Sequence, residues 1–178
     1  MQTTDTVLMI EPIAFGFNEQ TAVNNYFQVQ QEGNVQEKAL EEFHSFVEKL
    51  RAKGINVLTI KDTIDPKTPD SIFPNNWVSF HQDGKVVLYP MFADNRRLER
   101  REDIINQIKE KFDIKEIIDY SKIENENKYL EGTGSMIFDH DNKIAYGSVS
   151  LRLDEKLFRK FCAEFGFTPV VFHSYQTA

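Results

Sequence analysis

Two segments decide the fold: FHQDGKVVLY at Phe80–Tyr89 and FDHDNKIAYG at Phe138–Gly147. They align without a gap at an offset of 58 residues. Their centres carry the pairs Asp83-Gly84 and Asp141-Asn142, which tolerate the positive φ angles of a tight turn. Each segment is therefore predicted to form a β-hairpin.

A helical pattern and then a short strand follow each predicted hairpin. The helices are expected at Arg96–Phe112 and Asp154–Phe165, and the strands at Glu116–Tyr120 and Pro169–His173. The sequence thus predicts a hairpin–helix–strand module that occurs twice. The apolar residues expected to face inward are Leu98, Ile105, Ile108 and Phe112 in the first helix, and Leu157, Phe158, Phe161, Cys162 and Phe165 in the second.

A more divergent first copy is expected over Val7–Ile60. Its helix spans Asn34–Lys53 and ends before Gly54, and the strand Ile55–Ile60 comes next. The apolar positions of this helix are Ala39, Leu40, Phe43, Phe46, Val47 and Leu50.

Modules of this kind bury their apolar faces by stacking in an array or a ring. We therefore expect an α/β fold, a propeller of ββαβ modules of which about three are present, in a single domain over residues 1–178. Three copies leave an open edge, so the chain is expected to be an incomplete part of a larger ring. That edge could also support self-association.

Composition limits the class of partner. The chain has 178 residues and a formal net charge of -7, which disfavours binding to nucleic acid or to anionic lipid. No apolar run approaches the roughly 18 residues of a membrane span. The single cysteine, Cys162, cannot form an intrachain disulfide. We expect a cytoplasmic protein with a small-molecule partner and without a cofactor; without a Cys/His cluster at ligand spacing, no metal site is expected.

Polar residues that precede the two hairpins are candidates for one shared site, because matching positions of a ring face a common axis. By the offset of 58, Phe73 corresponds to Glu131 and Asn75 to Thr133. Glu131 lies in LEGTGS, where the glycines allow close approach of backbone. It could bind a cationic or hydrogen-bonding group, or it could only cap backbone amides. Asn75-Asn76, after a proline, could equally form an Asx-turn.

The same residues carry a family resemblance. DSIFPNN at Asp70–Asn76, EGTG at Glu131–Gly134 and GSVSLR at Gly147–Arg152 resemble motifs of the guanidino-group-modifying enzymes, which are five-bladed ββαβ propellers called penteins. This superfamily includes arginine deiminase, dimethylarginine dimethylaminohydrolase and the amidinotransferases. The strings closest to its citrulline-utilisation hydrolase branch are Phe15–Asn25, Pro69–Trp77, Leu88–Ala93, Arg96–Arg101 and Leu130–Ser135.

The resemblance implies that a cysteine thiolate attacks the planar carbon of a ureido or guanidino group, with a histidine as acid and base. Glu131 matches the glutamate that orients the substrate nitrogens. The family's histidine motif and nucleophilic cysteine are expected beyond Ala178, so this chain alone is expected to be inactive. Cys162 is expected to be a core residue, and His44, His81 and His140 are expected to be solvated. His173 precedes the histidine motif and does not match it.

The resemblance also suggests a binding role for five residues. Asn75 and Asn76 stand where the dimethylarginine and arginine hydrolases have a Glu-Asp pair, and carboxamides suit a neutral ureido group better than a guanidinium cation. Arg152 would grip the substrate carboxylate. Asp70 would bind the α-amino group, and Phe73 would form an apolar wall.

Citrulline hydrolysis to ornithine is thus the leading hypothesis. An amidinotransferase or an arginine-type deiminase would use the same thiol chemistry. The alternative from another class is a non-catalytic module that binds a ligand or has a regulatory role.

Overall fold

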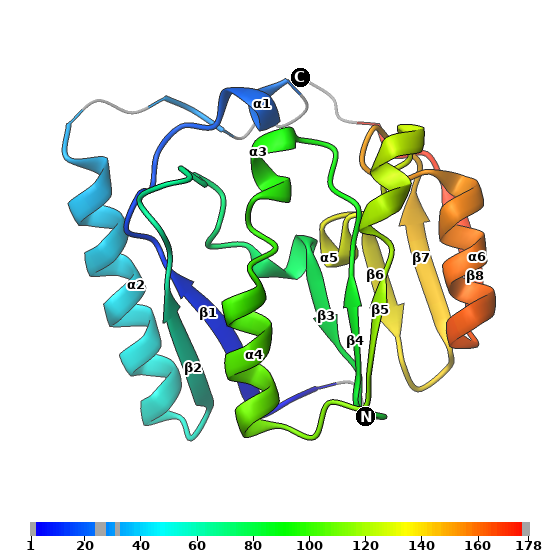
Figure 1. The fold of residues 1–178 in the computed structure, drawn as a ribbon, viewed down its shortest axis with the longest axis horizontal. Helices are drawn as coiled ribbons and strands as arrows, with labels where there is room; N and C mark the ends of the chain where they lie inside the picture. Colours follow the sequence, from blue (N-terminus) through cyan, green and yellow to red (C-terminus); the bar gives the residue numbers. More distant parts are fainter. Residues whose placement is uncertain (1–2, 24–27, 31–32, 176–178) are drawn as a thin grey trace. The chain divides into compact units, whose positions relative to one another are not determined.

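Both predicted hairpin modules are present in the computed structural model, each as a three-stranded sheet (Figure 1). In each module two antiparallel strands form the hairpin, and the strand after the helix pairs in parallel with the second of them. The confirmed elements are β3 (Val78–Phe80), β4 (Lys85–Leu88), α4 (Glu102–Lys111) and β5 (Glu116–Asp119), then β6 (Met136–Asp139), β7 (Ile144–Ser148), α6 (Glu155–Phe165) and β8 (Thr168–Phe172).

The structure describes residues 3–23, 28–30 and 33–175, which form two compact units. The N-terminal unit comprises residues 3–74 and 93–104, and the hairpin unit comprises residues 75–92 and 105–175. The end of the stretch Phe15–Asn25 lies outside the described residues. In the described part of the chain, no helix is both long and apolar enough to cross a bilayer.

The register of the hairpins corrects the gapless alignment. Val78 pairs with Leu88 in the first hairpin, and Met136 pairs with Gly147 in the second. The offset is therefore 58 in the first strand and 59 in the second, so the second turn holds one extra residue. Gly84 has the expected positive φ of 84°, but in the other turn the positive φ falls on Lys143 rather than on Asp141-Asn142.

Asp139 explains the difference between the two turns. Its Oδ1 accepts from the backbone N–H of Asn142 at 2.9 Å, and its Oδ2 accepts from the Asn142 side chain at 2.8 Å. These bonds hold residues 139–142 in a turn, and the left-handed residue that such a turn requires comes next, at Lys143.

The first copy has a parallel pair of strands, β1 (Thr6–Glu11) and β2 (Asn56–Lys61), joined through α2 (Val35–Ala52). Figure 1 shows α2 alongside this pair. Asn34 caps the helix, accepting from the N–H of Glu37, and Gly54 beyond its end has a φ of 81°. Phe46 was expected on the inner face but is 52% exposed, because it stands at the edge of the stripe whose buried member is Val47.

The prediction of a single helix over Arg96–Phe112 is wrong. The chain forms α3 (Asp94–Arg97) and α4, with a break between them. Leu98, in the break, is 49% exposed, and Phe112, past the end of α4, is 39% exposed. Arg96 turns inward instead: its buried guanidinium pairs with Glu99 at 2.9 Å and donates to the backbone carbonyls of Asp70 and Phe73. The buried contact of this segment is therefore a polar one, from Arg96 to these carbonyls, and not the apolar contact of Leu98 that helical periodicity predicts.

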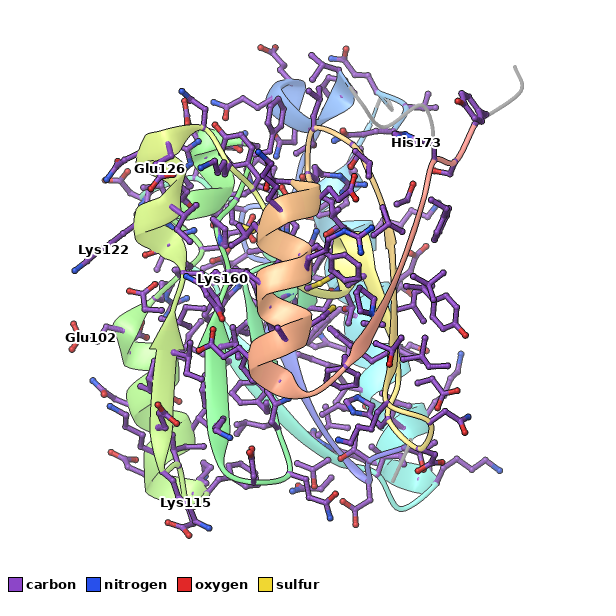
Figure 2. The ribbon with its side chains drawn as sticks, turned by 90° about the vertical axis from the view of Figure 1, so that its right-hand side faces the viewer. Glu102, Lys115, Lys122, Glu126, Lys160 and His173 are labelled. Atoms are coloured by element: carbon purple, nitrogen blue, oxygen red, sulfur yellow. The ribbon has the colours of Figure 1, made fainter. Side chains whose placement is uncertain are left out.

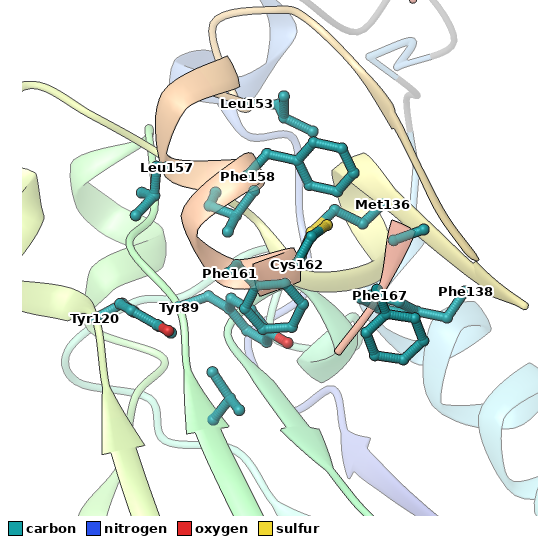
Figure 3. Packing of buried hydrophobic residues seen from close by; sticks show 13 residues of the cluster. Tyr89, Tyr120, Met136, Phe138, Leu153, Leu157, Phe158, Phe161, Cys162 and Phe167 are labelled. Carbon is teal, nitrogen blue, oxygen red and sulfur yellow. The ribbon is translucent and has the colours of Figure 1, made fainter. Parts of the chain in front are cut away.

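The core of the hairpin unit forms around α6, as Figure 3 shows. Asp154 caps α6 by accepting from the N–H of Leu157 at 2.8 Å, and Phe158, Phe161 and Cys162 are fully buried. This helix packs against both modules. Both modules contribute to its cluster: Val87 of β4, with Tyr89 and Tyr120 directly after β4 and β5, come from the first, and Met136, Phe138 and Ala145 come from the second. Stacking of one module on the next therefore closes this core, as the repeat predicts.

Candidate active site

Glu131 is a buried carboxylate whose two oxygens are both engaged. It is 1% exposed and stands directly before the short helix α5 (Gly132–Ser135), but its side chain makes no cap bond to that helix. Its Oε1 accepts from the backbone N–H of Phe92 at 3.0 Å, and its Oε2 accepts from Nδ2 of Asn76 at 3.0 Å. Such a carboxylate is fixed in orientation by its donors.

The glycines of LEGTGS make room for the neighbouring asparagine pair. Gly132 has a φ of 22°, and a Cβ at this position would overlap the backbone oxygen of Asn75. A Cβ at Gly134 would overlap the side-chain amide of Asn76. The close approach that the sequence predicts is therefore present, and the asparagine pair is what approaches.

The two asparagines differ in exposure. Asn75 is exposed, and its Nδ2 donates to Oγ1 of Thr133 at 3.0 Å, so the two positions related by the offset of 58 are in contact. Asn76 is buried at the end of a 3₁₀ turn, Pro74–Asn76. Because the Glu131 carboxylate can only accept, the Asn76 amide must turn its Nδ2 toward it, which leaves Oδ1 to accept from another group.

Arg152 lies beside Glu131, a contact that the sequence did not suggest. Its Nη1 is 3.7 Å from Oε2 of Glu131, and its backbone oxygen accepts from the N–H of Glu131 at 3.1 Å. The Ser150-x-Arg152 pattern forms a local turn in which Ser150 Oγ accepts from the N–H of Arg152 at 3.2 Å. The charges of Glu131 and Arg152 offset one another at this place.

Asp70 and Phe73 belong to the N-terminal unit. Oδ2 of Asp70 accepts from Nδ2 of Asn18 and from Oγ1 of Thr21, each at 2.8 Å. Asn18 is buried and also exchanges hydrogen bonds with the side chain of Asn95. Phe73 is 48% exposed. The structure thus assembles Asn75, Asn76, Glu131 and Arg152 within the hairpin unit and gives Asp70 its own polar cluster.

Two partners of the candidate residues, Asn18 and Phe92, were not predicted from the sequence. Asn18 carries a detectable signal, because an asparagine before GluGlnThr is typical of a helix N-cap, and it caps α1 (Glu19–Ala22) by accepting from the N–H of Gln20. Phe92 contributes only its backbone N–H, which no side-chain pattern can reveal.

Cys162 has the environment of a core residue. Burial raises the pKa of its thiol to about 11, so the thiol is protonated at neutral pH and is a poor nucleophile. In the described residues, no group of three or more His, Cys, Asp or Glu side chains is arranged to hold a metal ion.

The environments of the histidines agree only in part with the prediction that His44, His81 and His140 are solvated. His44 is mostly exposed and pairs with Glu11 at 3.0 Å, and His173 is exposed at the end of β8 (Figure 2). His81 is not simply solvated: its ring packs against that of Phe165, tilted by 34° with 5.0 Å between centroids, and burial lowers its pKa to about 4. His140 is likewise partly buried, against Phe138 and Phe167, and burial lowers its pKa.

Comparison with known proteins identifies one family. The model for eukaryotic N,N dimethylarginine dimethylhydrolase matches residues 11–178. A search of curated proteins gave no significant match.

Solved structures share the fold at low sequence identity. A mutant of DDAH from Pseudomonas aeruginosa, complexed with citrulline, is 15% identical with a TM-score of 0.67, over 97% of this chain and 62% of that chain. The substrate-bound N-terminal domain of ArgZ, an arginine dihydrolase from cyanobacteria, is 16% identical with a TM-score of 0.71, over 96% and 58%. A complex of AgrE with L-arginine is 15% identical with a TM-score of 0.74, over 96% and 24%.

The likeness shows the mixed α/β fold of the pentein propellers, here with small sheets that do not close. The chain spans 62% and 58% of the length of the first two of these relatives.

Proposed function

Since this chain belongs to the N,N-dimethylarginine dimethylhydrolase family, within the pentein superfamily of guanidino-modifying enzymes, we propose that it is part of a cysteine-dependent C–N hydrolase. The proposed substrate is citrulline, and the proposed products are ornithine, ammonia and carbon dioxide.

The contact between Asn76 and Glu131 carries this proposal. The amide is oriented by the carboxylate, so its Oδ1 is available to accept from a substrate N–H. Glu131 and Arg152 balance one another in charge at 3.7 Å. A site with no excess negative charge favours a neutral ureido group over a guanidinium cation, which prefers a carboxylate pair.

In the proposed reaction a thiolate attacks the ureido carbon, and the C–N bond to the ornithine side chain breaks. The departing amine takes a proton from a histidine acting as acid. Water then hydrolyses the carbamoyl thioester, which frees the thiol and gives carbamate, the source of ammonia and carbon dioxide. Glu131 orients the ureido nitrogens in the first step and the remaining carbamoyl nitrogen in the second.

We propose that chain outside these 178 residues supplies the attacking thiol, so that this chain by itself is inactive. Cys162 is the only cysteine of the sequence; it is fully buried among aromatic side chains, with a raised thiol pKa.

Three further roles belong to the proposal. Arg152 binds the substrate carboxylate with the guanidinium nitrogens that do not face Glu131. Asp70, whose Oδ2 is held by Asn18 and Thr21, binds the α-amino group, and the exposed ring of Phe73 forms an apolar wall.

A single cysteine fits a reducing compartment, so the cytoplasm is the proposed location. Self-association through the open edge stays a prediction.

Turnover by the protein expressed from its complete reading frame tests this proposal. Citrulline, arginine and dimethylarginine are supplied separately, and ornithine and ammonia are measured. Ornithine and ammonia in equal amounts from citrulline support the proposal. Turnover of arginine alone would favour a deiminase, and transfer of an amidino group to an added amine would favour an amidinotransferase. Citrulline binding without any product would favour a binding module.

Asn76→Asp sharpens the test, because it places a second carboxylate beside Glu131. We expect it to lower kcat/KM for citrulline by about a hundredfold or more, because like-charge repulsion replaces the hydrogen bond from Asn76 to Glu131. Asn106→Asp, on the exposed side of α4, introduces the same charge away from the site and should leave the rate unchanged.

A further inference from the structure

Glu124 holds the backbone segment that places an N–H on Glu131. We propose that Glu124 is a positioning residue for the Glu131 carboxylate, an inference whose kinetic arm rests on the proposed function. Oε1 of Glu124 accepts from the backbone N–H of Met91 at 2.7 Å. The next N–H along the chain, that of Phe92, donates to Oε1 of Glu131 at 3.0 Å. Two carboxylates thus receive two consecutive backbone N–H groups.

The segment between these carboxylates is tied to the chain around Glu131 at other points. The N–H of Leu130 donates to the carbonyl of Pro90 at 3.2 Å. The ring of Phe92 meets that of Tyr129 edge-on, with 5.4 Å between centroids. Met91 is fully buried, so its N–H cannot exchange Glu124 for bulk water. The bond from Met91 to Glu124 therefore acts together with these contacts, and it is the one adjacent along the backbone to the Phe92 N–H.

A 3₁₀ helix, η2 (Ser121–Glu126), delivers Glu124 to this bond. The helix ends at Asn127, which adopts a left-handed conformation with φ 55° and donates its N–H to the carbonyl of Glu124 at 3.0 Å. Glu124 is partly buried. Lys122 and Glu126 of the same helix are exposed and point away from the protein in Figure 2. Glu126 pairs with the partly exposed Lys128 and is itself exposed, so it offers a matched control.

Loss of the carboxylate at position 124 should act on Glu131 through the backbone. A buried N–H without an acceptor draws the peptide toward another partner, and the segment then shifts at Phe92. The Glu131 carboxylate would then keep Asn76 and Arg152 as partners but lose the backbone donor that fixes its Oε1. A group that must orient a reacting atom loses efficiency when it is misplaced by as little as about 1 Å.

The kinetic test compares Glu124→Met, Glu124→Gln and Glu126→Gln in the full-length protein with citrulline. Glu124→Met keeps the length of the side chain but removes the acceptor, and it should lower kcat by about tenfold to a hundredfold with little change in KM. Glu124→Gln keeps an acceptor oxygen and should restore most of that loss. Glu126→Gln should behave as the wild type. A wild-type kcat in Glu124→Met would overturn the proposal.

Amide hydrogen exchange tests the same inference without turnover. Glu124→Met should speed exchange at the Phe92 N–H by about tenfold, while the protected N–H groups of α6 stay as in the wild type. Equal acceleration throughout the hairpin unit would mean a general loss of stability and would contradict a positioning role. If the wild-type protein has no activity on citrulline, the proposed function fails, and the exchange at Phe92 still decides the role of Glu124.

Discussion

The partly buried ring of His81 should make the stability of this protein fall as the pH is lowered. His81 packs against Phe165, and its Nε2 lies 2.9 Å from Oγ of Ser79, which in turn shares a hydrogen bond with the buried hydroxyl of Tyr89. Burial is the main cause of a pKa of about 4; Asp83 opposes the shift, and His140, Lys85 and Lys143 add to it. The folded protein thus favours the neutral ring.

The size of the effect follows from proton linkage. The unfolded state protonates this histidine near pH 6.5 and the folded state only near pH 4. Between these values the unfolded state binds more protons, so the free energy of unfolding decreases as the pH falls. Each pKa unit is worth about 1.4 kcal/mol, so the loss from pH 7 to pH 4 is about 3 kcal/mol.

Urea unfolding at pH 7, 6, 5 and 4 measures this loss, with His81→Gln as the comparison. The variant keeps a polar group beside Ser79 but does not titrate, so its free energy of unfolding should fall by about 3 kcal/mol less than that of the wild type over this range. His44→Gln, at a mostly exposed site, is the control and should follow the wild type. Parallel curves for the wild type and His81→Gln would refute the argument.

Three other substitutions test the packing and the site. Gly134→Ala should lower the midpoint of thermal unfolding, because the added methyl group overlaps the amide of Asn76. Phe158→Ala should cost about 3–5 kcal/mol in urea unfolding, since it opens a cavity in the core around α6, and a loss below about 1 kcal/mol would contradict that packing. Glu131→Gln in the full-length protein should lower citrulline turnover by orders of magnitude, as measured by ammonia release, and a near-normal rate would exclude the proposed role of Glu131.

Much of the fold could be predicted because it depends on local chemistry. The hairpins follow from the turn residues of the two repeated segments, and α6 follows from a stripe of apolar, mostly aromatic residues at helical spacing. The prediction failed where a buried polar contact opposes the periodicity. Arg96 donates to the carbonyls of Asp70 and Phe73. A contact between segments so distant in the sequence does not appear in the hydrophobic periodicity of either segment.

In the candidate site too, some contacts could be predicted from the sequence and others could not. The glycines beside Glu131 indicated close packing, and the offset between the repeats matched Asn75 with Thr133, which are in contact. The repeat placed Asn76 and Glu131 in one shared site, but their direct bond, the backbone N–H of Phe92 and the neighbouring Arg152 could not be predicted. Contacts of this kind depend on how the modules stack.

The ratio of kcat/KM for citrulline to kcat/KM for arginine, measured with the full-length protein, tests the central claim most directly. A site lined by Asn75 and Asn76 rather than by two carboxylates should favour the neutral ureido group by about a hundredfold or more. A ratio below one, with arginine as the better substrate, would contradict the account.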